Sequence, residues 1–307
     1  MKIAHTYRRM RETMRAWRRK LPPFGIRRRL ARAARMAAAF VLTLALLGAA
    51  ALVFVAAQSR APLDRPSKLI EAEEGRSEAL QAVERIFALR RQGAERMDDA
   101  RLFAPDQRRA RIAALHAGAE GAAFAYLRAL RVRSGGRDTA VSELRRLLES
   151  ETPSAARLGE AVSRLNAAVA RERVRLSLDE SAYRRTTALA ADALDALADD
   201  LAAAAQAGRP GFARPQTDEL FHRARGAAFG WALILRGAAL DAEADQTTLQ
   251  AALQPALAAL DRAALDAPLF LFNGPRGSAT APNHLAPLAL DLALAARDLR
   301  IQSRRGD

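Results

Sequence analysis

The chain has 307 residues, a formal net charge of +15 and no cysteine. The lack of cysteine excludes a disulfide framework, a thiolate metal site and a cysteine nucleophile. Half of the residues are hydrophobic but only 5% are aromatic. Alanine and leucine dominate the apolar set, and because both favour helices over strands, we predict an all-α fold.

The positive charge is concentrated at the N-terminus. Residues 1–35 hold 13 Lys or Arg and one acid, Glu12, for a net charge of +12, which leaves +3 for the rest. The high isoelectric point therefore does not indicate a nucleic-acid-binding domain.

Residues 1–35 form a basic leader with an expected amphipathic helix. Its apolar face recurs at helical spacing: Ile3, Tyr7, Met10, Met14, Trp17 and Leu21. Such a helix is typical of an anionic membrane surface, and the candidate contacts are Trp17, Arg18, Arg19, Arg28 and Arg29. The simplest interpretation is that the arginines only fix the orientation of the chain in the membrane; docking on the membrane surface and contact with nucleic acid are the alternatives.

Residues 36–59, MAAAFVLTLALLGAAALVFVAAQS, contain no charged side chain. A bilayer core requires about 20 apolar residues in one helix, so we predict a transmembrane helix here. The basic excess before it predicts a cytoplasmic N-terminus and a periplasmic C-terminal domain of an inner-membrane protein. The alternative is a cleaved signal peptide, although the apolar run and the leader are both long for one.

Residues 60–66 are a Pro-containing linker, and residues 67–303 are predicted to form one periplasmic multi-helix bundle. The apolar positions follow helical periods without an internal repeat or a convincing strand, and stripes of this kind are typical of packing between antiparallel helices. Capping and breaking residues predict the following helices: Ser67 to about Arg91, Pro105 to about Val132, Asp138 to Glu149, one from Thr152-Pro153, one ending before Gly208, Thr217 or Asp218 to about Ala244, Gln246 to Leu265, and one after Asn283.

Two groups of polar residues are candidates for a ligand or partner site. Asp218, His222 and Arg225 are spaced to lie on one helical face, where a carboxylate could orient an imidazole base; a row of ion pairs is the structural alternative. The second group is Asn273, Gly274, Asn283 and His284 in the last loop, near Arg276. Turn formation and helix capping explain the same residues without a ligand.

The run Asp218–Gly226, DELFHRARG, is followed by Trp231, then by Phe272-Asn273-Gly274 and Asn283-His284-Leu285. With the basic leader and single span, these motifs resemble an uncharacterised family of single-pass inner-membrane proteins of proteobacteria, known as a domain of unknown function. The resemblance covers the span and about the last 90 residues. It implies this topology and a helical outer domain, and it supplies no catalytic residue.

No nucleotide-binding, nucleophile-elbow or metal-binding motif is present, and we expect neither a metal nor a cofactor. The sequence favours a non-enzymatic envelope interaction or scaffold protein that binds another envelope component or itself. The alternative is a periplasmic small-ligand sensor or enzyme that uses a pocket around Arg225, Asn273 and His284.

Overall fold

A computed structural model describes residues 24–58, 66, 75–98, 105–134, 138–150, 154–176, 179–207, 211–242, 246–268, 271–274 and 283–304. The predicted leader helix with Trp17, Arg18 and Arg19, and the loop around Arg276, lie outside these residues. The chain divides into two compact units, Met1–Phe54 and Val55–Asp307.

The first unit contains most of α2 (Phe24–Gln58), a single helix that joins the second basic run, with Arg28 and Arg29, to the apolar segment. Residues Ala34–Ala51 have a mean hydropathy of 1.8, and none of this segment is buried inside the protein. The hydroxyl of Thr43 donates to the carbonyl of Ala39, so this polar group is satisfied within the helix. The helix is long and apolar enough to cross a membrane, and a signal sequence would have the same properties.

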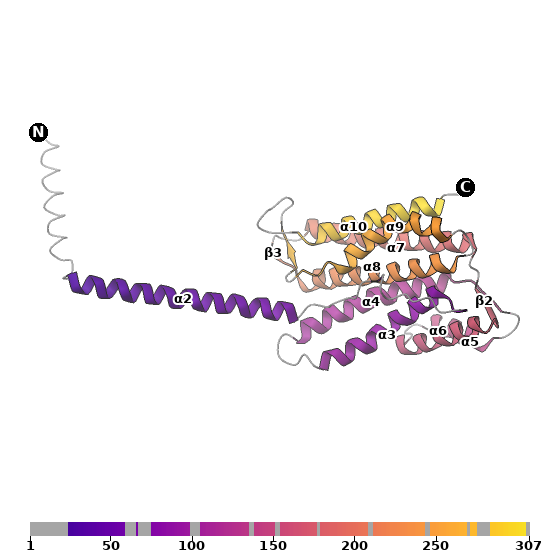
Figure 1. Cartoon of the computed structure of the whole chain (residues 1–307), viewed down its shortest axis with the longest axis horizontal. Coiled ribbons are helices and arrows are strands. Elements are labelled where there is room, and N and C mark those ends of the chain that lie inside the picture. Colours follow the sequence, from indigo (N-terminus) through magenta and orange to yellow (C-terminus); the bar gives the residue numbers. More distant parts are fainter. Residues whose placement is uncertain are drawn as a thin grey trace, which may run out of the picture. The chain divides into compact units, whose positions relative to one another are not determined.

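The second unit is a bundle arranged around α8 (Pro215–Asp241). In Figure 1, α8 runs through the middle, with α7, α9 and α10 on one side and α3, α4, α5 and α6 on the other. Nearly the whole circumference of α8 is buried, as expected for a central helix. The surrounding helices are α3 (Glu78–Asp98), α4 (Pro105–Ala129), α5 (Thr139–Leu148), α6 (Ala155–Ala170), α7 (Glu180–Ala207), α9 (Gln246–Leu265) and α10 (Leu285–Arg304). The all-α prediction for this unit is confirmed.

Small residues bring α4 and α8 into close contact. A Cβ atom on Gly226 would overlap the carbonyl oxygen of Leu115, and one on Gly118 would overlap that of Arg223. A Cβ on Gly230 would lie 3.0 Å from the Ala119 oxygen. Gly226 and Gly230 therefore permit the close approach of α8 to α4.

Four short strands in the connections correct the prediction that the chain has none. Strand β1 (Val132–Ser134) pairs antiparallel with β2 (Val174–Leu176), and β3 (Gly211–Phe212) with β4 (Phe272–Asn273). At two or three residues each, they are too short to show a two-residue period in the sequence.

The start of α3 was also predicted wrongly. Residues Gly75–Ser77 are not helical, and Gly75 has a φ of +78° that favours glycine. The α3 helix begins after Ser77, whose hydroxyl oxygen accepts from the Leu80 N–H at 3.2 Å.

Asp241, the last residue of α8, holds this end of α3. Its carboxylate accepts from the Ser77 hydroxyl at 2.6 Å, the Glu78 N–H at 2.7 Å and the Ala79 N–H at 3.0 Å. A carboxylate is favourable at a helix N-terminus, where unpaired N–H groups point outward. Burial raises the pKa of Asp241, and these three hydrogen bonds oppose the rise.

Candidate functional site

Asp218 lies inside α8, in its first turns, and does not cap it. The helix begins three residues earlier at Pro215, a residue favoured at the first helical position. The carboxylate of Asp218 accepts from Arg111 of α4 through two bonds, 2.7 Å from Nε to Oδ2 and 2.8 Å from Nη2 to Oδ1. The side chains of Asp218 and Arg111 are 11% and 9% exposed. The carboxylate thus forms a buried, bidentate ion pair with Arg111 of the neighbouring helix, whereas the sequence suggested His222 as its partner.

His222 contacts Arg225 one turn further along α8. Nη1 of Arg225 is 3.2 Å from Nδ1 of His222. Because a guanidinium can only donate, Nδ1 accepts and the ring proton resides on Nε2. Burial, together with the nearby positive charges of Arg225 and Arg111, lowers the pKa of His222 to about 3. His222 is therefore a neutral imidazole at neutral pH, with too little basicity for a general base near pH 7.

The depressed pKa of His222 predicts a pH-dependent stability. Between its unfolded pKa near 6.5 and its folded value of about 3, the unfolded chain binds a proton that the folded chain does not. Stability from this residue is complete above pH 6.5 and decreases as pH falls, by about 2 kcal/mol between pH 7 and pH 5. Urea unfolding of the full chain, followed by tryptophan fluorescence, should show this loss, and His222→Gln should remove about that much of it. An identical pH dependence in His222→Gln and wild type would contradict the assignment.

Arg225 holds the C-terminal end of α9. Its Nε and Nη2 atoms donate to the carbonyl oxygen of Ala264 at 3.2 and 3.0 Å, and the residue is 1% exposed. Carbonyls in the last turn of a helix have no partner within the helix and carry partial negative charge, so a buried guanidinium stabilises them. Asp266 follows α9 directly; burial raises its pKa, and the nearby charge of Arg225 is among the effects that oppose the rise.

Asn283 and His284 join the last loop to α10. The Asn283 Oδ1 atom accepts from the N–H groups of Leu285 and Ala286, both at 3.1 Å, and Nδ2 donates to the Gly274 carbonyl at 3.0 Å. The prediction that Asn283 caps the last helix is confirmed. Nδ1 of His284 accepts from the Phe272 N–H at 3.0 Å, so its ring proton also resides on Nε2.

Asn273 is brought beside Asn283 by an antiparallel bridge. It is 5% exposed, and its Nδ2 lies 3.5 Å from the carbonyl of Ala205 in the last turn of α7. Its Oδ1 is buried without a hydrogen-bond partner among the described residues. This buried acceptor has spare hydrogen-bonding capacity within the described structure.

The predicted site residues therefore gather at helix ends. Arg225 holds α9, Asn283 holds α10, and the loop pairs with β3 beside α7. Asp266 lies within electrostatic range of both Arg225 and His284, which connects the two groups that the sequence singled out. Arg225, Asn283 and the loop thus have structural roles, and binding of a ligand by these residues stays a prediction.

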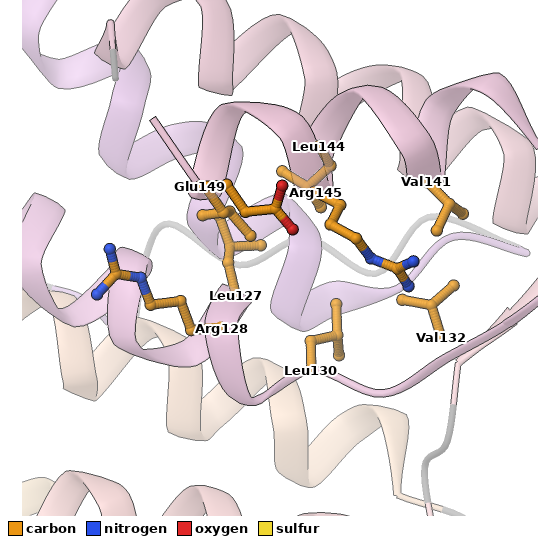
Figure 2. A pocket seen from close by; sticks show the side chains of 9 residues that line it. Leu127, Arg128, Leu130, Val132, Val141, Leu144, Arg145 and Glu149 are labelled. Carbon is orange, nitrogen blue, oxygen red and sulfur yellow. The ribbon is translucent and has the colours of Figure 1, made fainter. Parts of the chain in front are cut away.

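A cavity of about 330 Å³ lies elsewhere, between the C-terminal end of α4 and α5. Figure 2 shows its lining. Six apolar residues form its walls: Leu127, Leu130, Val132, Val141, Leu144 and Leu148. Arg128, Arg145 and Glu149 also line it, and all three are exposed. We call this the α4–α5 groove.

The α4–α5 groove was not predicted from the sequence. One signal was available, because Val141, Leu144 and Leu148 recur at helical spacing in a short helix whose opposite face is charged. The other wall could not be found in this way, since Val132 belongs to a strand of three residues. Arg111 was also not predicted, because its ion-pair partner Asp218 is 107 positions away in the sequence.

No family model, curated protein or solved structure matches this chain. The resemblance to the family of single-pass membrane proteins stays a prediction.

Proposed function

We propose that this protein is a single-pass inner-membrane protein whose periplasmic helical domain binds another component of the cell envelope and performs no catalysis. The observation that carries the proposal is the long apolar segment Ala34–Ala51, which is not buried among the residues that the structure describes. Such a surface requires an apolar environment, and a bilayer supplies one.

The charge distribution supports the orientation. Thirteen Lys or Arg precede the span, and only Arg60, Arg65, Lys68 and Arg76 follow within about 20 residues. This asymmetry favours a cytoplasmic N-terminus. The leader, with Trp17, Arg18, Arg19, Arg28 and Arg29, would contact anionic lipid headgroups.

The polar side chains of the bundle support a binding role over a catalytic one. The basic and acidic groups with the most catalytic promise are used to join helices: Asp218 to Arg111, Arg225 to Ala264, and Asp241 to the start of α3. A general base needs a pKa near the working pH, and the low pKa of His222 argues against it in that role. The exposed α4–α5 groove provides a surface for a partner instead.

The proposal is tested by cross-linking intact cells that express the chain at its native level. We expect a specific protein partner with the wild-type chain and with a variant whose residues 36–59 are replaced by an unrelated apolar span. A variant in which residues 1–59 are replaced by a cleavable signal peptide, which releases the domain, should recover much less of it. Recovery of no protein, or equal recovery from the released domain, would contradict an anchored interaction protein.

A further inference from the structure

The α4–α5 groove lies between the C-terminal end of α4 and α5, and most of the residues that line it are apolar. The α5 helix packs on α6, and its residues Val141, Leu144 and Leu148 present one stripe toward the groove. Leu127 and Leu144 are nearly covered, at 3% and 4% exposed, and form the floor. Leu130, Val132, Val141 and Leu148 are half-buried. Apolar side chains from a binding partner would complete their burial.

The rim of the groove is basic. Arg128 and Arg145 line it, and Arg131 and Arg146 follow each of them closely in sequence; all four are exposed. Glu149 is the acid that lines the groove. Figure 2 shows the side chains of Arg128 and Arg145 directed toward opposite ends, with Glu149 between them. Arg128 and Arg145 thus place a positive charge near each end of the apolar groove, where each could pair with a negative charge on a partner.

We propose that the α4–α5 groove binds an acidic amphipathic helix of the partner protein, with apolar side chains in the groove and a carboxylate near each of Arg128 and Arg145. This inference rests on the proposed function and names the chemistry of its partner. A helix with anchors at i, i+3 and i+7 matches a groove of this kind. A lipid has one headgroup and would engage one arginine, whereas a peptide supplies two separated acids.

The test uses the full chain in lipid nanodiscs and a fluorescein-labelled helical peptide. The peptide has leucines at i, i+3 and i+7 and glutamates at both ends, and a twin peptide has lysines in place of the glutamates. We expect the glutamate peptide to bind roughly tenfold tighter, the effect of about 1.4 kcal/mol, with a preference that weakens as salt is added.

Two double variants test whether the preference for the glutamate peptide arises at the α4–α5 groove. In the double variant Arg128→Glu/Arg145→Glu the lysine peptide should bind better than the glutamate peptide. The matched control, Arg157→Glu/Arg171→Glu, changes two exposed arginines of the α6 region and should keep the wild-type preference. Circular dichroism should be unchanged in both, because the substituted side chains are exposed.

Several results would overturn the assignment. These are equal binding of the two peptides, a preference that the groove variants leave unchanged, displacement of the glutamate peptide by equimolar oleate, and a dimer of the chain that only the groove variants abolish. Failure here is distinguishable from failure of the proposed function. If cross-linking in cells recovers a partner that binds another face, the proposed function stands and only the groove assignment fails. If the peptide binds the groove but no partner is recovered from cells, the proposed function is contradicted.

Discussion

Gly226→Ala should destabilise the protein by about 3 kcal/mol, the upper end of the usual cost of overpacking, because the atoms that the new methyl group meets are backbone atoms of a neighbouring helix. The new methyl carbon would overlap the Leu115 carbonyl oxygen and lie 2.7 Å from its carbon. Alanine is worth up to about 1 kcal/mol over glycine in a helix, which does not offset the clash. We expect a lower urea midpoint, measured by circular dichroism.

The chain offers a matched control for this substitution. Gly121 lies in α4 as well, but a Cβ atom there would meet nothing within 4 Å. Gly121→Ala should therefore raise stability by up to about 1 kcal/mol through helix propensity alone. Gly118→Ala should behave like Gly226→Ala, since its Cβ would overlap the Arg223 carbonyl. Equal midpoints for Gly121→Ala and Gly226→Ala would refute the close α4–α8 contact.

Asp218→Leu should cost about 3–5 kcal/mol, because it leaves the buried guanidinium of Arg111 without its carboxylate. Both side chains are nearly buried and joined by two short bonds. The double variant Arg111→Met/Asp218→Leu should regain most of the loss, since apolar residues of similar volume replace buried ion pairs at little cost. Chemical unfolding of the wild type, Arg111→Met, Asp218→Leu and the double variant completes a double-mutant cycle.

Glu219→Gln is the control for the ion-pair cycle. Glu219 is next to Asp218 but exposed, and it pairs with Arg223 across one turn of α8 at 2.6 Å. An exposed pair of this type contributes less than about 1 kcal/mol. If Asp218→Leu had no larger effect than Glu219→Gln, or if the double variant were no more stable than the single one, the buried pair would not have its assigned role.

The helices with clear local signals were predicted well from sequence. The α9 helix has the predicted bounds, Gln246 to Leu265, and α5 begins after Asp138, whose side chain accepts from the Ala140 N–H. Caps and breakers act within a few residues, so a single sequence contains the information. The α6 helix buries Leu158, Val162 and Leu165, which recur at helical spacing, in line with the expectation that apolar stripes pack between helices.

Long-range contacts account for what could not be predicted. The start of α3 depends on Asp241, which is more than 160 positions away in the sequence. Each short strand forms because it pairs with a segment that is distant in the sequence, β1 with β2 and β3 with β4. For the candidate site, the sequence identified the residues at the helix ends but not their partners: Arg111, Ala264 and Phe272 carry no local sign that they face Asp218, Arg225 and His284.

In the proposed topology, α2 spans the membrane and the bundle lies on its outer side. Because the chain contains no cysteine, single substitutions can be labelled without background. His5→Cys lies in the leader and Ser150→Cys in an exposed turn after α5. A membrane-impermeant maleimide should label Ser150→Cys in cells with an opened outer membrane, and His5→Cys only after lysis, with the full-length chain in the membrane fraction. The reverse labelling pattern, or a shortened chain in the soluble fraction, would contradict the account.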